Sequence, residues 1–401
     1  MKYTKLRKRG NDMFDFDYNP ERRGTNSTKW NVKEGELPMW IADMDFETAP
    51  AVKRAIEERA KHGIYGYTDV PEEWYNAIIG WWKRRFEFSI EKEWLQFCTG
   101  IVPAISSIVK RVTNIGDRVA VLTPAYNIFF NSIENAGRCA AQCHLVYKNG
   151  KYSIDFKALE EVLSHPLTTL MIFCNPHNPT GNIWTEAELS KVGALCKKYG
   201  VTVISDEIHC NFVMNGHRYI PFASVSEECR EISITCISAS KTFNIAGLQT
   251  AAVVVPDRHL REKVVRGLNS DEVAEPNCFA IDSVVAAFNE GEEWLDGLNS
   301  YVAKNRRFVE DYLKKNLPKA LPVKSNATYV VWIDCGGFCT DTDKLCEFLR
   351  KQTGLILSAG SIFRGNGKTF VRLNTACNRE KLEDGLNRFV TGVKEYIKCQ
   401  Q

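Results

Sequence analysis

Short apolar runs alternate with longer amphipathic segments between residues 95 and 255, and this alternation constrains the fold more than any other feature of the chain. The runs occupy residues 95–99, 118–122, 169–174, 201–205, 232–238 and 251–255. Apolar runs this short are typical of buried strands, and the segments that separate several of them have the spacing of helices. Strands that alternate with helices form a mostly parallel sheet with helices on both faces. The pattern therefore predicts an α/β fold for this region.

The rest of the sequence divides into two flanking parts. Residues 1–48 lack helical periodicity, and a long helix predicted at 292–317 leads into a region that mixes strands and helices. In that region we expect strands near 329–334 and 369–375, and helices near 342–352 and 379–396. We therefore predict an N-terminal arm (1–48) that contributes to a small domain, a large domain (49–290), and a small C-terminal α+β domain (291–401).

Composition and charge argue against several classes of function. Of the 401 residues 25% are charged and 44% are hydrophobic, and the formal net charge is only +3. A charge this small does not favour nucleic acid or a membrane surface as a partner. The basic start Met1–Arg9 lacks the apolar core of a signal peptide, no apolar run is long enough to span a membrane, and the histidines show no metal-ligand spacing. We therefore expect a cytoplasmic protein with no metal site.

A lysine follows one of the predicted strands directly. The run Ile232–Ile237 leads into Ser238-Ala-Ser-Lys-Thr, which places Lys241 at the edge of the sheet, where open α/β folds bind ligands. A lysine that its neighbours keep partly deprotonated can form an imine with an aldehyde or ketone. Ser238 and Ser240 could donate hydrogen bonds to an anion. Taken alone, the stretch also fits an ordinary solvated lysine after a strand.

Two further stretches place polar side chains at strand ends. Asn175-Pro-His-Asn-Pro-Thr-Gly contains two prolines, which make a rigid turn that can aim Asn178 at a ligand. The run Val203-Ile-Ser ends at Asp206, whose carboxylate is costly to bury unless it is paired or faces a ligand. Opposite a pyridine nitrogen, such a carboxylate would keep the ring protonated and make it an electron sink. His209 could reach a second polar group. Taken alone, however, Asn178 also fits an ordinary loop asparagine, and His209 also fits a core histidine whose hydrogen bonds are satisfied.

Glycine-containing turns indicate one candidate phosphate site and argue against another. Thr99-Gly-Ile-Val-Pro-Ala opens a predicted helix, and backbone N–H groups at a helix start suit a phosphate. Gly365-Asn-Gly-Lys-Thr is similar to the end of a nucleotide-binding P-loop. However, Ile362 stands where that motif requires its first glycine, and a strand-like run follows instead of a helix. The sequence therefore does not predict nucleotide binding there.

Together these stretches resemble the fold-type I enzymes that use pyridoxal 5′-phosphate, specifically the class I and II aminotransferase superfamily. The resemblance covers nearly the whole chain, and Asn178, Asp206 and Lys241 stand in the family's order with similar separations. It implies a mostly parallel central sheet covered by helices, a smaller α+β domain, and pyridoxal 5′-phosphate as the cofactor.

The resemblance also implies a role for each matching residue. Lys241 would hold the cofactor as an imine and act as the catalytic base, Asp206 would pair with the pyridine nitrogen, and Asn178 would bond the 3′-oxygen. Tyr126 would stack on the ring, and Arg372 would clamp the substrate carboxylate with its planar guanidinium. The other implied cofactor contacts are His209, the backbone of Gly100, Ile101 and Val102, the side chains of Ser238 and Ser240, and Tyr67 from a partner subunit. The contact from the partner implies a homodimer.

Four segments resemble one subgroup, the MalY/PatB-type cystathionine β-lyases and related C–S lyases. They are Arg23-Gly-Thr-Asn-Ser, Trp40-Ile-Ala-Asp-Met-Asp-Phe, Asp206-Glu-Ile-His and Ser240-Lys-Thr-Phe-Asn-Ile-Ala-Gly. His209 and Gln249 replace a tyrosine and a phosphate-binding arginine that many aminotransferases have, which fits the subgroup. Asn378 and Arg364 replace a proline and a glycine expected in the subgroup, and these departures leave the preferred substrate open.

The resemblance therefore implies a pyridoxal-phosphate-dependent carbon–sulfur β-lyase. It would act on cystathionine or another S-substituted L-cysteine and give pyruvate, ammonia and a thiol by β-elimination. Two alternatives stay open at this point: a class I/II aminotransferase, and a regulator that keeps the cofactor fold and binds a partner through a separate surface. The sequence also leaves open which thiol is released.

Overall fold

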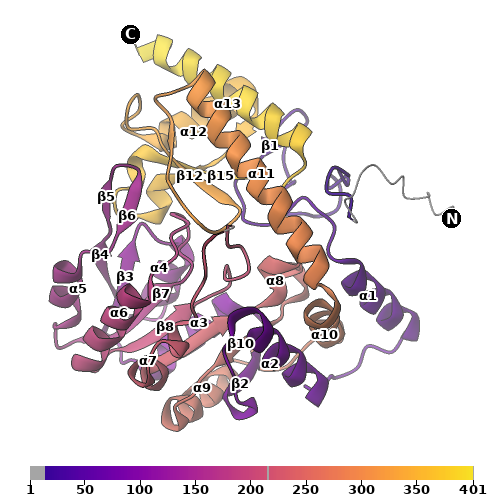
Figure 1. Ribbon diagram of the computed structural model, residues 1–401, viewed down its shortest axis with the longest axis vertical. Helices are drawn as coiled ribbons and strands as arrows, with labels where there is room; N and C mark the ends of the chain where they lie inside the picture. The colour runs from indigo at the N-terminus through magenta and orange to yellow at the C-terminus, as the bar shows by residue number, and fades with distance from the viewer. Residues whose placement is uncertain (1–13, 215, 401) are drawn as a thin grey trace.

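The computed structural model describes residues 14–214 and 216–400, and its centre is a seven-stranded sheet (Figure 1). In their order across the sheet the strands are β2 (Leu95–Cys98), β10 (Ala251–Val254), β9 (Ser233–Ile237), β8 (Thr202–Asp206), β7 (Thr168–Cys174), β3 (Arg118–Thr123) and β4 (Cys139–His144). The five strands from β9 to β4 are parallel, whereas β10 is antiparallel to both β9 and β2. The prediction of a mostly parallel sheet is confirmed. The predicted basic tail Met1–Arg9 lies outside the described residues.

Helices cover both faces of this sheet because alternate strand residues are apolar on both sides. Val119 and Val121 of β3 belong to one buried cluster, and Ala120 and Leu122 belong to another on the opposite face. The first face packs against α3 (Ile101–Val112), α4 (Asn127–Glu134) and α9 (Arg258–Ser270), and the second against α5 (Phe156–Leu163), α6 (Glu186–Lys198) and α7 (Glu227–Ile232). A strand buried on both faces is a continuous apolar run in the sequence, which explains why these strands could be predicted.

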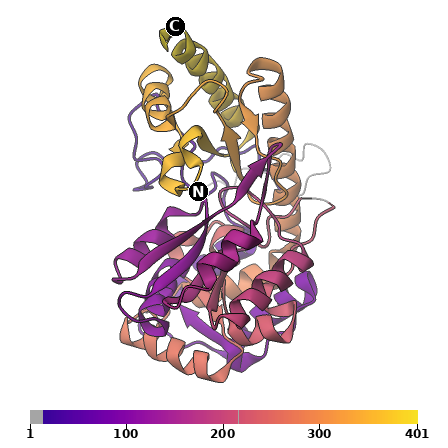
Figure 2. The same ribbon diagram turned by 90° about the vertical axis from the view of Figure 1, so that its left-hand side faces the viewer.

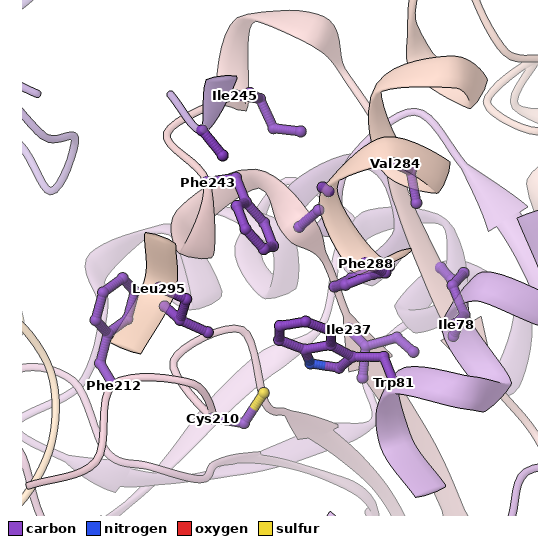
Figure 3. Packing of buried hydrophobic residues seen from close by; sticks show 14 of the residues in the cluster. Ile78, Trp81, Cys210, Phe212, Ile237, Phe243, Ile245, Val284, Phe288 and Leu295 are labelled. Carbon is purple, nitrogen blue, oxygen red and sulfur yellow. The ribbon is translucent and has the colours of Figure 1, made fainter. Parts of the chain in front are cut away.

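A third core surrounds the short helix that carries Lys241. It involves α1 (Pro50–His62), α2 (Glu72–Phe86), α8 (Ala239–Thr242), α10 (Ala280–Glu290) and the start of α11 (Glu292–Asn316). Trp81, Phe243 and Phe288 form an aromatic cluster there, with ring centroids 5.1 to 6.0 Å apart (Figure 3). Such pairs contribute about 0.5–1.5 kcal/mol each beyond the area they bury. Because Phe243 directly follows α8, this packing fixes the helix of Lys241.

The C-terminal part of the chain forms a smaller unit beside the main sheet (Figure 2). Its four-stranded antiparallel sheet has the order β11 (Leu321–Pro322), β12 (Val330–Asp334), β15 (Phe370–Asn374) and β14 (Ser358–Ala359), and it packs with α12 (Thr342–Thr353) and α13 (Arg379–Gln400). The N-terminal arm joins this unit, because β1 (Leu37–Pro38) pairs in parallel with β13 (Leu355–Ile356) and Trp30 is buried in its core. The pairing supports the predicted contribution of the arm, while the division into domains at 48 and 290 stays a prediction.

Several elements were not predicted. They include the edge strand β4, the hairpin of β5 (Val146–Lys148) and β6 (Lys151–Ser153), the short strands β11, β13 and β14, and the helices α5, α7 and α9. The sequence of β4, Cys-Ala-Ala-Gln-Cys-His, contains no β-branched residue, and half of its residues are exposed, so it lacks the apolar run of a central strand. No helix within residues 14–214 and 216–400 has the length and apolar content needed to cross a membrane.

Candidate active site

Three of the predicted site residues meet because the strands that precede them are neighbours in the sheet. Cys174 of β7 is paired with Asp206 of β8, and Asp206 is paired with Cys236 of β9. The chain leaving β7 carries Asn178, and the chain leaving β9 carries Lys241. Parallel strands present their carboxyl ends at one edge, and open α/β sheets bind ligands at that edge.

A cavity of about 190 Å³ lies at this edge of the sheet. Its lining includes six residues that the sequence placed in the site: Tyr126, Asn178, Asp206, His209, Lys241 and Arg372. The other lining residues are Trp40, Ile41, Ala42, Asn127, Ile208, Ser358 and Ile362. The wall is therefore built by the large sheet, the N-terminal arm and the C-terminal unit together.

Lys241 reaches from α8 to the N-terminal arm. Its Nζ donates a hydrogen bond of 2.6 Å to the backbone oxygen of Ala42. Burial lowers the pKa of Lys241 to about 8, and the charge of Arg372 acts in the same direction, whereas the carboxylates of Asp43 and Asp206 oppose it. A lysine with a lowered pKa has a larger neutral fraction near neutral pH, and the neutral amine is the form that attacks a carbonyl carbon.

Asp206 and His209 are buried polar groups with unmet bonding capacity. Asp206 is 3% exposed, and its carboxylate accepts a hydrogen bond of 3.3 Å from the backbone N–H of Ile208. Burial raises the pKa of Asp206 to about 7 and lowers that of His209 to about 3, so the imidazole is neutral. His209 Nδ1 is buried without a hydrogen-bond partner among the described residues. A carboxylate in this position is costly unless a cationic ligand group faces it.

Arg372 of β15 connects all three walls of the cavity. Its Nη1 donates to Asn178 Oδ1 at 3.1 Å, and its Nη2 donates to the backbone oxygen of Trp40 at 2.9 Å. The guanidinium lies 4.8 Å from the ring centroid of Phe363, and its Nε has no partner within the described part of the chain. Burial lowers the pKa of Arg372 to about 10, so the group stays cationic at neutral pH. A fixed, planar cation of this kind suits a carboxylate.

The residues predicted to bind the phosphate are not part of the cavity lining. Gly100 precedes α3, and no side chain caps this helix, so the first backbone N–H groups, including those of Ile101 and Val102, have no capping partner from a side chain. The strand β2 that precedes α3 runs in the same direction as β9, because β10 lies antiparallel between them. The start of α3 therefore faces the same edge of the sheet as Lys241.

The two serines before Lys241, Ser238 and Ser240, differ in whether their hydroxyl groups already form hydrogen bonds within the chain. Ser238 donates a hydrogen bond of 2.8 Å to the backbone oxygen of Thr250 and accepts one of 2.9 Å from the backbone N–H of Ser240. Its hydroxyl proton is therefore already used to order the turn into α8. Ser240 is half-buried, so its hydroxyl is closer to solvent than that of Ser238. Of the two, Ser240 is better placed to donate to a phosphate.

Tyr67 does not line the cavity of its own chain. It lies on the segment between α1 and α2 and is fully exposed. Within residues 14–214 and 216–400 no hydrogen bond holds the side chain of Tyr67, and its contact with a partner subunit stays a prediction.

Sequence reasoning missed the residues that hold the arm over the site. Tyr329 donates to the Ala42 backbone oxygen at 2.8 Å, and Asn374 donates to the backbone oxygens of Ile41 and Asp43, both at 2.6 Å. Asn374 stands two residues after Arg372 on β15, and residues two apart on a strand share a face. That alternation is the one signal in the sequence that could have suggested Asn374.

These residues fit a bound pyridoxal 5′-phosphate. Lys241 supplies an amine of lowered pKa, Asp206 a buried carboxylate that needs a cationic partner, and Asn178 an amide at the neighbouring strand end. The uncapped start of α3 suits the phosphate. An aldehyde, a ring nitrogen, a ring oxygen and a phosphate thus each find a matching group along one edge of the sheet.

Comparison with known proteins agrees with this geometry. The family model for class I and II aminotransferases matches residues 37–389. The sequence is 41% identical to cystathionine beta-lyase PatB from Bacillus subtilis over 381 residues, which cover 93% of this chain and 98% of that protein. Cystalysin from Treponema denticola, whose crystal structure contains pyridoxal 5′-phosphate, matches with a TM-score of 0.93 at 29% identity, covering 96% of this chain and all of that one. The PLP-bound C–S lyase from Staphylococcus hominis matches with a TM-score of 0.89 at 32% identity, covering 95% and 98%. The chain therefore belongs to the class I and II aminotransferase family, and within it to the group that contains PatB.

Proposed function

We propose that this protein is a pyridoxal-phosphate-dependent lyase that performs β-elimination on an S-substituted L-cysteine and releases pyruvate, ammonia and a thiol. The observation that carries the proposal is that Lys241, Asp206, Asn178 and Arg372 line one cavity together. PatB and the enzyme from Staphylococcus hominis, each matched over 98% of its length, are named cystathionine beta-lyase and C–S lyase, which favours a lyase over an aminotransferase.

The residues of the chain bind the substrate and move its proton. Arg372 holds the α-carboxylate through its guanidinium, and this fixes the orientation of Cα in the cavity. The neutral amine of Lys241 takes the proton from Cα as a general base, a role that its lowered pKa favours. When bound, pyridoxal phosphate supplies the electron sink for the pair that this proton leaves behind. Asp206, whose carboxylate is part of the lining, would keep the ring nitrogen charged.

The cavity favours a neutral thioether side chain over an acidic one. Its lining holds two cationic side chains, Lys241 and Arg372, and the proposed chemistry already uses both of them. Trp40, Ile41 and Ile362 provide apolar surface where the sulfur substituent would lie. Aspartate would carry its second carboxylate directly on Cβ and would need another cation there. A thioether needs only apolar contact at that position, and this holds for cystathionine too, because its second carboxylate lies at the far end of the side chain.

We also propose that the protein is a homodimer in which Tyr67 reaches the cofactor phosphate of the partner. Ile64, Tyr65 and Tyr67 are 67%, 56% and 104% exposed, which leaves three large hydrophobic side chains close together on one loop. Exposed apolar patches of this kind are typical of interaction surfaces. A second copy of the chain, which would bring the same loop to the other site, accounts for both features.

The reaction type can be decided by its products. The holoenzyme is incubated with S-methyl-L-cysteine or L-cystathionine, without any oxo acid, and pyruvate and free thiol are measured over time. We expect both products in equal amounts, and Lys241→Ala protein serves as the control. Turnover that requires 2-oxoglutarate and yields glutamate would instead establish the aminotransferase. Absence of both reactions would favour the regulator that keeps the cofactor fold.

A further inference from the structure

Arg364 has a backbone conformation that is almost confined to glycine. It follows η4 (Gly360–Phe363) and has φ 59° and ψ −160°. A residue with a β-carbon persists in this region only where the surrounding structure over-determines it, and such residues cluster at functional sites. The resemblance to the MalY/PatB-type lyases leads to the expectation of a glycine at this position.

The side chain of Arg364 joins the C-terminal unit to the large domain. Its Nη2 forms an ion pair of 2.7 Å with Glu134 Oε1, and its guanidinium lies 3.8 Å from the ring centroid of Phe130. Both partners belong to α4, the helix that begins directly after Tyr126. The two contacts use both the charge and the flat face of the guanidinium, which lysine cannot reproduce.

The neighbours of Arg364 are in close contact with the same part of the large domain. The backbone oxygen of Phe363 accepts a hydrogen bond of 2.8 Å from the N–H of Ala125. A β-carbon on Gly365 would lie 3.0 Å from the backbone nitrogen of Pro124, so the chain passes very close there. Residues 363–365 are therefore fastened along the segment from Pro124 to Glu134 by backbone and side-chain contacts together.

The segment of residues 363–365 contacts the proposed carboxylate-binding group, Arg372, through the ring of Phe363. Ile362 lines the cavity, and Phe363 lies under the guanidinium of Arg372 at 4.8 Å. Arg364 itself is not part of the lining, and its side chain is 34% exposed. An effect of Arg364 on the carboxylate site is therefore indirect, and the contact of Phe363 with Arg372 provides a route for it.

We infer that Arg364 is a positioning residue that sets the affinity of the site for the α-carboxylate of an amino acid. It holds the segment with Phe363 against α4, and Phe363 in turn fixes the guanidinium of Arg372 in the cavity. The inference rests on the proposed function in one respect, because it takes Arg372 as the carboxylate-binding group. It goes beyond that function by assigning a role to a residue outside the cavity.

The test compares two ligands that differ only in the carboxylate. L-Methionine and its decarboxylated analogue 3-(methylthio)propylamine are titrated into holoenzyme, and binding is followed by the change in cofactor absorption. Wild type is compared with Arg364→Gly, Arg364→Lys and Glu134→Gln. Arg218→Ala is the matched control, because Arg218 forms an exposed ion pair with Glu87 and does not line the cavity.

We expect Arg364→Gly to weaken L-methionine binding by roughly three- to tenfold, the range expected for a partly exposed ion pair and a cation–π contact. Binding of the amine should not change. Arg364→Lys and Glu134→Gln should give smaller losses, and the control none. With S-methyl-L-cysteine, KM should rise more than kcat falls. The thermal midpoint of Arg364→Gly should not decrease, because glycine relieves the backbone strain.

Equal losses for both ligands, or no loss for L-methionine, would overturn the inference. If Arg364→Gly protein unfolds, Glu134→Gln decides the matter, since it leaves the backbone of residue 364 unchanged. The binding assay needs no turnover. A wild type that binds L-methionine but makes no pyruvate from S-methyl-L-cysteine therefore contradicts the proposed reaction and leaves this inference standing. A wild type that binds neither ligand overturns the carboxylate site and this inference with it.

Discussion

Arg372 Nη1 lies 3.1 Å from Asn178 Oδ1, although the two residues are 194 positions apart in the sequence. The group proposed to hold the substrate carboxylate therefore donates directly to the group proposed to orient the cofactor ring. The same guanidinium donates to the Trp40 backbone oxygen. Substrate and cofactor would thus be positioned by one connected set of hydrogen bonds. A change at Arg372 should therefore alter substrate binding, the first step of the reaction.

Arg372→Lys keeps the positive charge and loses the planar fork. A single ammonium cannot replace both donated hydrogen bonds and still bind a carboxylate with two parallel bonds. We expect the dissociation constant for L-methionine to rise by roughly 10- to 100-fold, as for the loss of one charge-assisted hydrogen bond. Titration of the holoenzyme measures this directly.

The absorption of bound cofactor is the control for Arg372→Lys, because it reports on Lys241. It should be close to that of wild type. A variant with unchanged affinity for L-methionine would show that the carboxylate binds elsewhere.

Lys241→Ala should abolish covalent attachment of the cofactor and nearly all turnover. Purified wild type should be yellow, whereas the variant should lose the absorption band of the attached cofactor. Loss of the general base should lower kcat by roughly a thousandfold. A variant that keeps wild-type turnover of S-methyl-L-cysteine would remove Lys241 from the mechanism.

The fold could be predicted as far as burial leaves a pattern in the sequence. Central strands such as β7 and β8 could be predicted because they are apolar on both sides. The half-exposed edge strand β4 could not be predicted in this way. The helix α9 was missed because five of its 13 residues are charged and only Val264, Gly267 and Leu268 are buried. Local composition identifies an element only when its surroundings impose a strong preference.

The site could be predicted where its side chains follow strands and not where it uses backbone atoms. Asp206 and Lys241 follow apolar runs, so their position at the sheet edge could be deduced. The backbone oxygen of Ala42, which accepts hydrogen bonds from Lys241 and Tyr329, could not, because every residue has such an oxygen. Its place depends on how the arm packs against two other parts of the chain.

Tyr67 allows a test of shared active sites. We expect Tyr67→Phe alone to weaken cofactor binding, and Lys241→Ala alone to be inactive. In a mixed dimer, one site should combine both defects and the other should have neither, because Tyr67 acts on the partner subunit's site. Mixing the two variants under conditions of subunit exchange should therefore raise activity above the sum of the separate samples.

Cofactor affinity in the mixed dimers gives the matching control for Tyr67. Sites with wild-type affinity should appear only after exchange. An active monomer in light scattering, or mixing that never restores activity, would contradict the proposed dimer.

Asp206 should make the cofactor-free protein less stable as the pH rises. Burial raises the pKa of Asp206 from 3.8 to about 7, while in the unfolded chain the carboxyl ionises at its ordinary value. Between pH 4 and pH 7 the unfolded chain therefore binds fewer protons than the folded chain. The contribution of Asp206 to the free energy of unfolding falls through this range, and the loss is complete above about pH 7.

Asp206→Asn cannot ionise and should avoid this loss. The free energy of unfolding of the cofactor-free variant minus that of cofactor-free wild type should be larger at pH 8 than at pH 5. The increase should be on the order of a few kcal/mol. Urea unfolding of both proteins at the two pH values measures the difference. Burial also raises the pKa of Glu207, but Glu207 is present in both proteins, so its contribution cancels in the comparison. With pyridoxal phosphate added, the advantage of the variant should shrink, because a cationic ring nitrogen compensates the Asp206 charge. A difference in stability that does not depend on pH would show that Asp206 is not kept protonated by burial.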